Sequence, residues 1–208
     1  MRRWLQYGGF AAGIVLVLFG VVAIALGVSG RSTVRDSLRQ EQIVGSSDMT
    51  PAAITAEAKA AGLTNVSLPT CNVAGKTVDS GSTARCFASY MRIHALEATG
   101  GLPYSQLPRY ATADGKGTND EALAAKGDNG RPLDNPTRAL WINETALSTA
   151  LNVSYMAGQL ALFGIVVGIA LLLSGIGFIV LAAFGTLRIG SASREPAATT
   201  PLSTPATV

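Results

Sequence analysis

Two long runs without a charged residue constrain this chain more than any other feature of its sequence. The first covers the 27 residues 4–30, and the second covers the 43 residues 145–187. An uncharged apolar run of about 18 residues or more is long enough to cross a bilayer as a helix. A soluble domain usually carries about 25% charged residues, whereas this chain of 208 residues carries 14%. The sequence therefore predicts a membrane protein and excludes an ordinary soluble enzyme.

The two runs predict transmembrane helices at residues 5–28 and 158–187. At about 1.5 Å per residue, the first spans about 36 Å, which exceeds a hydrocarbon core of about 30 Å. A cleaved signal peptide is the alternative for this first run, because Arg2 and Arg3 supply a basic start. The run is longer than the apolar region of a signal peptide, so we expect an uncleaved anchor. Neither run contains an ionisable residue, which argues against a pump or a proton relay.

The charges outside the runs predict that both ends of the chain are cytoplasmic. Residues 31–144 hold twelve basic and twelve acidic side chains, so the formal charge of +3 lies on the two ends. Positive charge favours the cytoplasmic side of a membrane. Residues 1–4 and 188–208 are then cytoplasmic, and residues 29–157 form an extracytoplasmic domain. The segment 188–208 is rich in Pro, Thr and Ala and is predicted to be disordered.

The extracytoplasmic domain is predicted to be helical at both of its margins. No Gly or Pro lies between Arg31 and Val44, so the first helix is expected to continue outwards. The pair Asn135-Pro136 is a helix start signal and predicts one helix from about residue 136 to residue 188. The predicted fold is a mainly α membrane protein whose two transmembrane helices extend into an antiparallel extracytoplasmic stalk.

A small, loop-rich helical cap is expected between the two helices of the stalk. The pair Thr50-Pro51 predicts the start of a short helix that ends at Gly62. A second helix is expected over residues 86–98. Residues 99–136 are rich in Gly, Pro, Asn and Asp and are expected to form ordered loops.

The first turns of the long second helix have an amphipathic pattern. We interpret Leu140, Leu147 and Leu151 as one side of this helix and Glu144 as part of the other side. This pattern predicts a helix that is amphipathic at first, with a leucine side that packs, and then apolar all round.

The only two cysteines, Cys71 and Cys86, both lie in the predicted extracytoplasmic domain. An even number of cysteines in an oxidising compartment favours one disulfide. Closing a loop of about 15 residues would stabilise the domain by about 3 kcal/mol in the chain-entropy description. The alternatives are two free thiols or half of a metal site, although the spacing does not match the CxxC pattern of metal sites.

No pattern of chemically active residues predicts catalysis, a metal site or a bound cofactor. His94 is the only histidine, which excludes a mononuclear site that needs two histidines from one chain. It lies on the apolar stripe of an expected helix, so a packed histidine is favoured over an acid, a base or a metal ligand. The chain also lacks a phosphate-binding glycine loop and a nucleophile elbow. We therefore expect no enzyme, no cofactor and no nucleic-acid partner.

A basic stripe follows the first uncharged run, because Arg31, Arg35 and Arg39 recur every four residues. Such a stripe next to a bilayer can hold anionic lipid headgroups or an acidic partner. The alternative is a solvated helix face whose arginines pair with nearby carboxylates, namely Asp36, Glu41 or Glu144.

Small residues recur every seven positions in both uncharged runs. They are Gly13, Gly20 and Gly27 in the first, and Ala161, Gly168, Gly175 and Ala182 in the second, where Gly164 also forms a GxxxG pair with Gly168. Small residues at one heptad position let membrane helices approach closely. Glycine is common in membrane helices, so chance is the alternative. Because the period occurs in both runs, it favours packing, either within one chain or in a homo-oligomer.

The stretch from Tyr90 (YMRIHALEATGG) to the second run (ALWINETALSTALNVSYMAGQLALFGIVVGIALLL) resembles a group of actinobacterial two-pass membrane proteins of unknown function. Some members of this group are labelled aromatic ring-opening dioxygenase. This sequence does not support that label, because such iron enzymes need more than one histidine ligand and only His94 is present. The resemblance implies a bacterial plasma membrane location and nothing catalytic.

These observations favour a non-enzymatic function, as a structural or accessory component of a membrane or cell-envelope assembly. The expected partners are the lipid bilayer and a protein of a membrane complex. The alternative is a sensor whose extracytoplasmic domain binds a ligand and signals through the paired helices, although the short tail has no output domain. A channel formed by oligomerisation is a third class, which the lack of a polar stripe in the two runs argues against.

Overall fold

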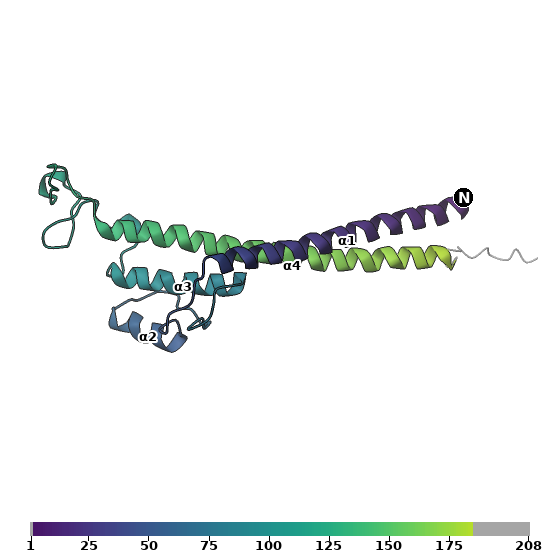
Figure 1. Ribbon diagram of the computed structural model, residues 1–208, viewed down its shortest axis with the longest axis horizontal. Helices are drawn as coiled ribbons and strands as arrows, with labels where there is room; N and C mark the ends of the chain where they lie inside the picture. The colour runs from purple at the N-terminus through teal and green to yellow at the C-terminus, as the bar shows by residue number, and fades with distance from the viewer. Residues whose placement is uncertain (1, 185–208) are drawn as a thin grey trace, which may run out of the picture. The chain divides into compact units, whose positions relative to one another are not determined.

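The computed structural model of the protein describes residues 2–184, and these residues are mainly helical (Figure 1). No β-strand occurs in this part of the chain, where the only extended pairings are isolated bridges. The predicted tail at 188–208 and the last residues of the second predicted span lie outside the described residues. The helices are α1 (Arg2–Gln40), α2 (Pro51–Ala60), α3 (Gly81–Ala98) and α4 (Pro136–Ala183), with short 3-10 helices η1 (Tyr104–Gln106) and η2 (Glu121–Leu123).

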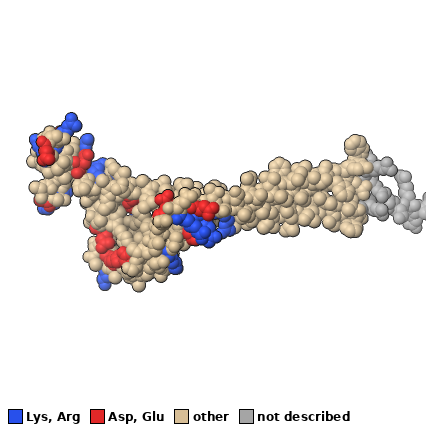
Figure 2. All heavy atoms as spheres, viewed as in Figure 1, with Lys and Arg blue, Asp and Glu red and all other residues tan. Residues whose placement is uncertain are grey.

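Helices α1 and α4 are each long and apolar enough to cross a membrane. Many of their large apolar side chains are exposed, and Phe19 and Leu173 have 64% and 62% of their surface accessible. Figure 2 shows no charged side chain along the apolar stretch of these helices on the face toward the viewer. Exposed apolar surface on this scale marks a site of contact with other molecules or with a membrane.

Backbone contacts divide the chain into two compact units, each of which contains part of α1 and part of α4. The smaller unit takes α1 up to Gly20 and α4 from Ala170 onwards, and the larger unit is Val21–Ile169. In the smaller unit the two helices run antiparallel, because the Gln6 side-chain amide donates to the carbonyl of Ala182 at 3.4 Å, while Gly13, later in α1, lies against Gly175, earlier in α4.

In the smaller unit, Gly13 and Gly175 meet so closely that neither position has room for a side chain. A Cβ added to Gly13 would lie 2.7 Å from the carbonyl oxygen of Gly175. A Cβ added to Gly175 would lie 2.7 Å from the carbonyl oxygen of Gly13 and 2.8 Å from the backbone nitrogen of Val17. Non-bonded carbon atoms have their optimal separation at about 3.5–4.0 Å. The contact therefore depends on glycine at both positions.

In the larger unit, Gly27 makes a contact of the same kind. A Cβ added to Gly27 would lie 2.6 Å from the carbonyl oxygen of Ala161. The packing at Gly164 is looser, because a Cβ there would meet nothing closer than 3.7 Å. Gly20 and Gly168, which share the seven-residue period, are both buried in the structure.

Helix α3 begins at Gly81, five residues before the start that the sequence predicted at residue 86. Ser80 caps this end, because its hydroxyl accepts a hydrogen bond from the Thr83 N–H and its own N–H donates to the Thr83 hydroxyl. Such a reciprocal box usually has Glu or Gln at the third helical position, and threonine concealed the signal. Gly81 also lies against α4, since a Cβ there would be 2.8 Å from the Cα of Tyr155.

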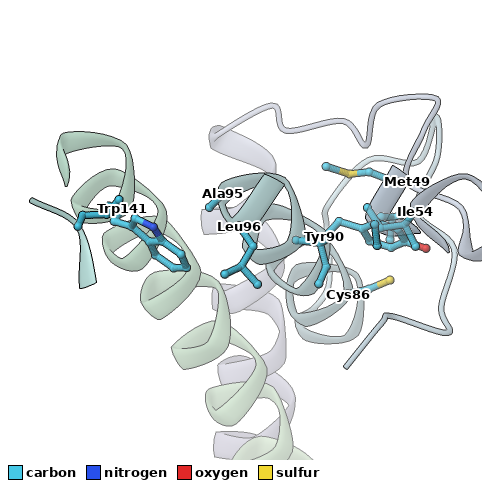
Figure 3. Packing of buried hydrophobic residues seen from close by; sticks show 11 residues of the cluster. Met49, Ile54, Cys86, Tyr90, Ala95, Leu96 and Trp141 are labelled. Carbon is cyan, nitrogen blue, oxygen red and sulfur yellow. The ribbon is translucent and has the colours of Figure 1, made fainter. Parts of the chain in front are cut away.

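The main core of the larger unit lies between α2, α3 and the first turns of α4 (Figure 3). Ile54 and Tyr90 are fully buried at its centre. The Tyr90 hydroxyl donates to the carbonyl of Cys71 at 2.6 Å, and burial raises the pKa of this phenol. Cys71 is also joined to Cys86, which confirms the predicted disulfide. One loop is thus held onto α3 by a covalent bond and by a buried hydrogen bond.

The buried side of α4 differs from the one that the amphipathic pattern predicted. Leu140 and Leu147 are 36% and 39% exposed, whereas Glu144 is 6% exposed. Trp141 and Leu151 are 3% and 2% exposed and define the side that packs. Glu144 lies on this same side, three residues after Trp141 and seven before Leu151. The interpretation placed Glu144 on the wrong side of the helix. Glu144 follows Leu140 by four residues and precedes Leu147 by three, so at about 3.6 residues per turn it lies on the same side as the leucines.

Substitutions at Gly175 and Gly177 test the close contact between α1 and α4. Both glycines lie in the same helix, but a Cβ at Gly177 would meet nothing within 4 Å. Gly175→Ala should lower the midpoint of thermal unfolding in detergent, by the equivalent of about 1–3 kcal/mol, because it adds a carbon to a contact that is already closely packed. Gly177→Ala adds the same methyl group and should leave the midpoint unchanged or raise it. Equal midpoints for the two variants would show that the contact does not contribute to stability.

A cysteine pair at Gly30 and Ala161 tests whether α1 and α4 pair within one chain. A Cβ on Gly30 would lie 3.5 Å from the Cβ of Ala161, within the about 3.5–4.5 Å that a disulfide needs. With a protease site inserted at Gly115, the cleaved halves of Gly30→Cys/Ala161→Cys should stay joined until reductant is added. Gly30→Cys/Val166→Cys is the control, because Val166 is 57% exposed. Disulfide-linked dimers would instead place the contact between two chains.

Candidate functional site

A pocket of about 470 Å³ opens between α1, α3 and α4 in the larger unit. Arg31 and Arg35 line it from α1, Ser80 and Gly81 from the start of α3, and Tyr155 from α4. Arg31 is the first residue after an uncharged run of α1. The pocket therefore begins where the apolar segment of α1 ends, and we call it the basic pocket.

Arg35 of the basic pocket and Arg39, one turn further along α1, share a single carboxylate. Asp79 Oδ2 lies 3.6 Å from Arg35 Nη2 and 3.2 Å from Arg39 Nη2. Asp79 takes the place of the carboxylates that the sequence offered as ion-pair partners, which were Asp36, Glu41 and Glu144. The reason is tertiary: the N–H of Val78 donates to the carbonyl of Ile43 at 2.9 Å and brings the segment before α3 back to the end of α1.

Arg31 has no ion-pair partner among residues 2–184. Two of the three arginines of α1 thus pair with one carboxylate and Arg31 pairs with none, so the pocket carries an excess of positive charge. The start of α3 adds to it, because the first N–H groups of a helix point outwards and carry a partial positive charge. Guanidinium groups beside such a helix start are a chemistry that binds phosphate and carboxylate oxygens.

Tyr155 forms an aromatic wall of the basic pocket. The guanidinium carbon of Arg85, one turn into α3, lies 4.7 Å from the centre of the Tyr155 ring. Leu162, in the apolar part of α4, lines the pocket further along the same helix. The pocket therefore has a charged end and an apolar end, and a ligand that suits it is amphiphilic.

A second cluster brings together the single histidine and two carboxylates. Asp48 lies in the turn before α2, Glu57 lies on α2, and His94 lies on α3. His94 Nε2 is 3.5 Å from Asp48 Oδ2 and 3.6 Å from Glu57 Oε2. This nitrogen is buried and has no hydrogen-bond partner in the described structure. The ligand atoms of the three residues all lie within 4.8 Å of one another.

The carboxylate of Asp48 is held in its ionised form. The Ser46 hydroxyl donates to it, and this hydrogen bond is the largest cause that lowers the pKa of Asp48 below its usual value. Backbone N–H groups and His94 lower the pKa further, against a smaller opposing effect of burial. The cluster therefore presents a carboxylate that stays negatively charged near neutral pH.

A shallow groove of about 680 Å³ lies between α3 and α4 and is mostly apolar. Met91 and Ala95 line it from α3, and Leu140 and Leu147 line it from α4. The buried carboxylate of Glu144 lies among these side chains. The two leucines that the amphipathic pattern assigned to the packed side thus form a wall of this groove.

The structure brings some predicted site residues together and adds others that the sequence analysis missed. Arg31 and Arg35 share the basic pocket, whereas Arg39 contributes only through its pair with Asp79. His94 is partly packed, as predicted, but it also faces two carboxylates, Asp48 and Glu57. No spacing in the sequence links them to His94, because they come from separate elements. One signal in the sequence could have indicated part of the basic pocket. Ser80 is a capping residue that follows Asp79, so it could have predicted that this carboxylate lies at the start of a helix.

Comparison of the chain with models of protein families, with curated proteins and with solved structures finds no match. Its function therefore has to follow from the chemistry of the basic pocket and of the histidine–carboxylate cluster.

Proposed function

We propose that this protein is a non-enzymatic, two-pass membrane protein and a structural or accessory component of a membrane or cell-envelope assembly. Its helices α1 and α4 cross the plasma membrane of a bacterium, and both ends of the chain are cytoplasmic. Beyond the membrane the two helices continue as a short antiparallel stalk, on which α2, α3 and the loops form a cap. The basic pocket binds the headgroup of an anionic phospholipid from the outer leaflet.

The membrane crossing is supported by the length and composition of the two helices. The apolar windows of both have a mean hydropathy of 2.8 and are only 17% buried. A core helix of a soluble protein would be covered by the rest of the molecule, and these helices are not. The glycine contacts at Gly13 and Gly27 supply the close packing that helices in hydrocarbon need, because lipid removes the hydrophobic drive between them.

The headgroup proposal rests on one observation, which is the unpaired Arg31 in a pocket that starts at the end of the apolar segment. A phosphate group there would meet Arg31, Arg35 and the first N–H groups of α3. The acyl chains would leave past Leu162 along the apolar surface of α4. A soluble anion would use only the charged end of this pocket, whereas a phospholipid uses both ends.

Asp79 controls how much positive charge the pocket presents. It neutralises part of the charge of Arg35 and Arg39, both of which are more than half exposed. Exposed ion pairs contribute about 0–1 kcal/mol to stability, so the effect of this carboxylate on folding is small. Its main effect is on the affinity of the pocket for an anion.

The first experiment titrates short-chain phosphatidylglycerol into the detergent-purified protein and measures lipid retention by native mass spectrometry. A basic residue near a membrane surface contributes about 1 kcal/mol of attraction to anionic lipid, so Arg31→Gln should weaken binding about fivefold. Asp79→Asn should strengthen binding by a similar factor, because it frees two arginines. Phosphatidylcholine, which has no net charge, should bind weakly to every variant.

Asp36→Asn is the matched control for Asp79→Asn. Asp36 lies on α1 beside Arg35, is exposed and does not line the pocket. The two variants make the same change in net charge. If both strengthen binding equally, the attraction is a general property of the surface and the pocket proposal is wrong. Displacement of the lipid by low concentrations of inorganic phosphate would identify the ligand as a soluble anion instead.

The second experiment tests the orientation in intact cells with a thiol reagent that does not cross membranes. Lys116→Cys lies in an exposed loop of the cap and should be labelled, while Cys71 and Cys86 are protected by their disulfide. Ser203→Cys in the tail should react only after the cells are permeabilised, because the positive charge favours the cytoplasm there. The opposite pattern of labelling would reverse the proposed orientation.

The alternative function is a membrane sensor whose extracytoplasmic domain binds a ligand. The groove between α3 and α4 favours it, because its volume lies within the about 300–1,000 Å³ of small-molecule sites. The buried carboxylate of Glu144 would select a small molecule with an apolar body and a cationic group. A sensor has to change the contact between α1 and α4 when it binds such an amine. The rate of Gly30→Cys/Ala161→Cys crosslinking would then depend on the ligand, and in a purely structural component it would not.

A further inference from the structure

We propose that Asp48, Glu57 and His94 form a binding site for a divalent transition-metal cation, for which Zn²⁺ is the appropriate probe. This inference is independent of the lipid site, because the two sites share no residue. It concerns the only histidine of the chain, which neither the membrane helices nor the basic pocket uses.

The distances between the three side chains suit one small cation. His94 Nε2 lies 3.5 and 3.6 Å from the two carboxylate oxygens. Zn²⁺ binds nitrogen and oxygen at about 2.0–2.2 Å, so two of its ligand atoms at a tetrahedral angle are about 3.3–3.5 Å apart. The three ligand atoms are within 4.8 Å of one another. Rotation of the partly exposed carboxylates would bring all three ligand atoms to one ion.

The state of His94 Nε2 is the observation that points to a ligand. This atom is buried, it has no hydrogen-bond partner among the described residues, and it lies within 3.6 Å of two carboxylate oxygens. Separations of 3.5 and 3.6 Å are too long for good hydrogen bonds. A neutral imidazole with its proton on Nδ1 would direct a lone pair at negative charge, which is unfavourable, and with its proton on Nε2 it would make only these long contacts. A cation between the three groups removes this repulsion, because the neutral imidazole nitrogen is the commonest metal ligand in proteins.

The fold holds the three ligands on well-packed elements. Glu57 and His94 belong to α2 and α3, which pack against each other through Ile54 and Ile93 in the main core. The hydroxyl of Ser46 donates to Asp48 and orients its carboxylate. Such a hydrogen bond from outside the ligand set is a regular feature of metal sites. The site is therefore organised before an ion arrives.

The set of ligand atoms selects the type of cation. One imidazole nitrogen and two carboxylate oxygens suit Zn²⁺, Mn²⁺ or Fe²⁺, whereas Mg²⁺ and Ca²⁺ prefer oxygen ligands alone. The two carboxylates would neutralise the charge of a divalent ion. Three protein ligands leave one position of a tetrahedral ion for water. The bound ion would join the turn before α2 to α3 and stabilise the cap.

The competing explanation is a histidine that is protonated and forms ion pairs with Asp48 and Glu57. Both arrangements hold α2 and α3 together, but only one of them depends on added metal. Because the chain has a single histidine, any effect of metal on an imidazole can be assigned to His94, provided that the affinity tag contains no histidine.

The experiment uses the full chain in detergent after treatment with a chelator. Addition of Zn²⁺ should give one bound ion per chain by elemental analysis and should raise the midpoint of thermal unfolding, whereas Mg²⁺ should do neither. Glu57→Gln and His94→Gln should each weaken Zn²⁺ binding by at least about tenfold. Glu97→Gln is the matched control, since Glu97 is an exposed glutamate on α3 outside the cluster and should bind Zn²⁺ like the unmodified chain.

Zn²⁺ binding that Glu57→Gln and His94→Gln leave unchanged would overturn the proposal. So would a melting midpoint that falls in these variants to the same extent with and without Zn²⁺, which is the result that the ion-pair explanation expects. If a variant does not fold, the ¹⁵N resonances of the single imidazole in the unmodified chain decide. Saturating Zn²⁺ should shift the Nε2 resonance, and an unshifted resonance rules out the site.

Discussion

The close approach of the α1 and α4 backbones is the contact on which the rest of this structure depends. At Gly27 and at Gly175 the carbonyl of the opposite helix occupies the place that a side chain would take. Between apolar helices in lipid, association comes from such van der Waals contact and not from the exclusion of water. The larger unit has another close backbone contact at a glycine, Gly81, where the start of α3 lies directly on the backbone of α4 at Tyr155.

The packing of the helices also determines which charged groups of the larger unit meet. Once α3 is placed on α4, Asp79 lies within reach of Arg35 and Arg39, and Arg31 is left without a carboxylate among residues 2–184. The disulfide and the Tyr90 hydroxyl hold the loop at Cys71 onto α3. The same packing of α2 on α3 brings His94 to its two carboxylates. Both proposed ligand sites are thus consequences of how helices stack, and neither is built into a single element.

The sequence predicts those parts of the fold that depend on residues close together in the chain. The helix start at Pro136 agrees with its prediction, because Asn135 and proline act locally, and the Asn135 side chain accepts from the Thr137 N–H. The start of α3 was placed too late, because Ser80 is capped through a threonine. The side assigned to Glu144 was wrong, because a residue four after Leu140 and three before Leu147 lies on the leucine side of the helix.

The sequence by itself determined the properties that depend on neighbours within a few turns. These are the two helices long and apolar enough to cross a membrane, the seven-residue period of small residues, and the basic stripe that begins at Arg31. The presence of two cysteines also limited the disulfide to one pairing. Only the tertiary structure decided which polar groups meet. Asp79 and Arg39 are separated by 40 residues along the chain, and His94 reaches Asp48 and Glu57 across three elements. Such meetings depend on the path of the chain in space, and no local pattern of residues records that path.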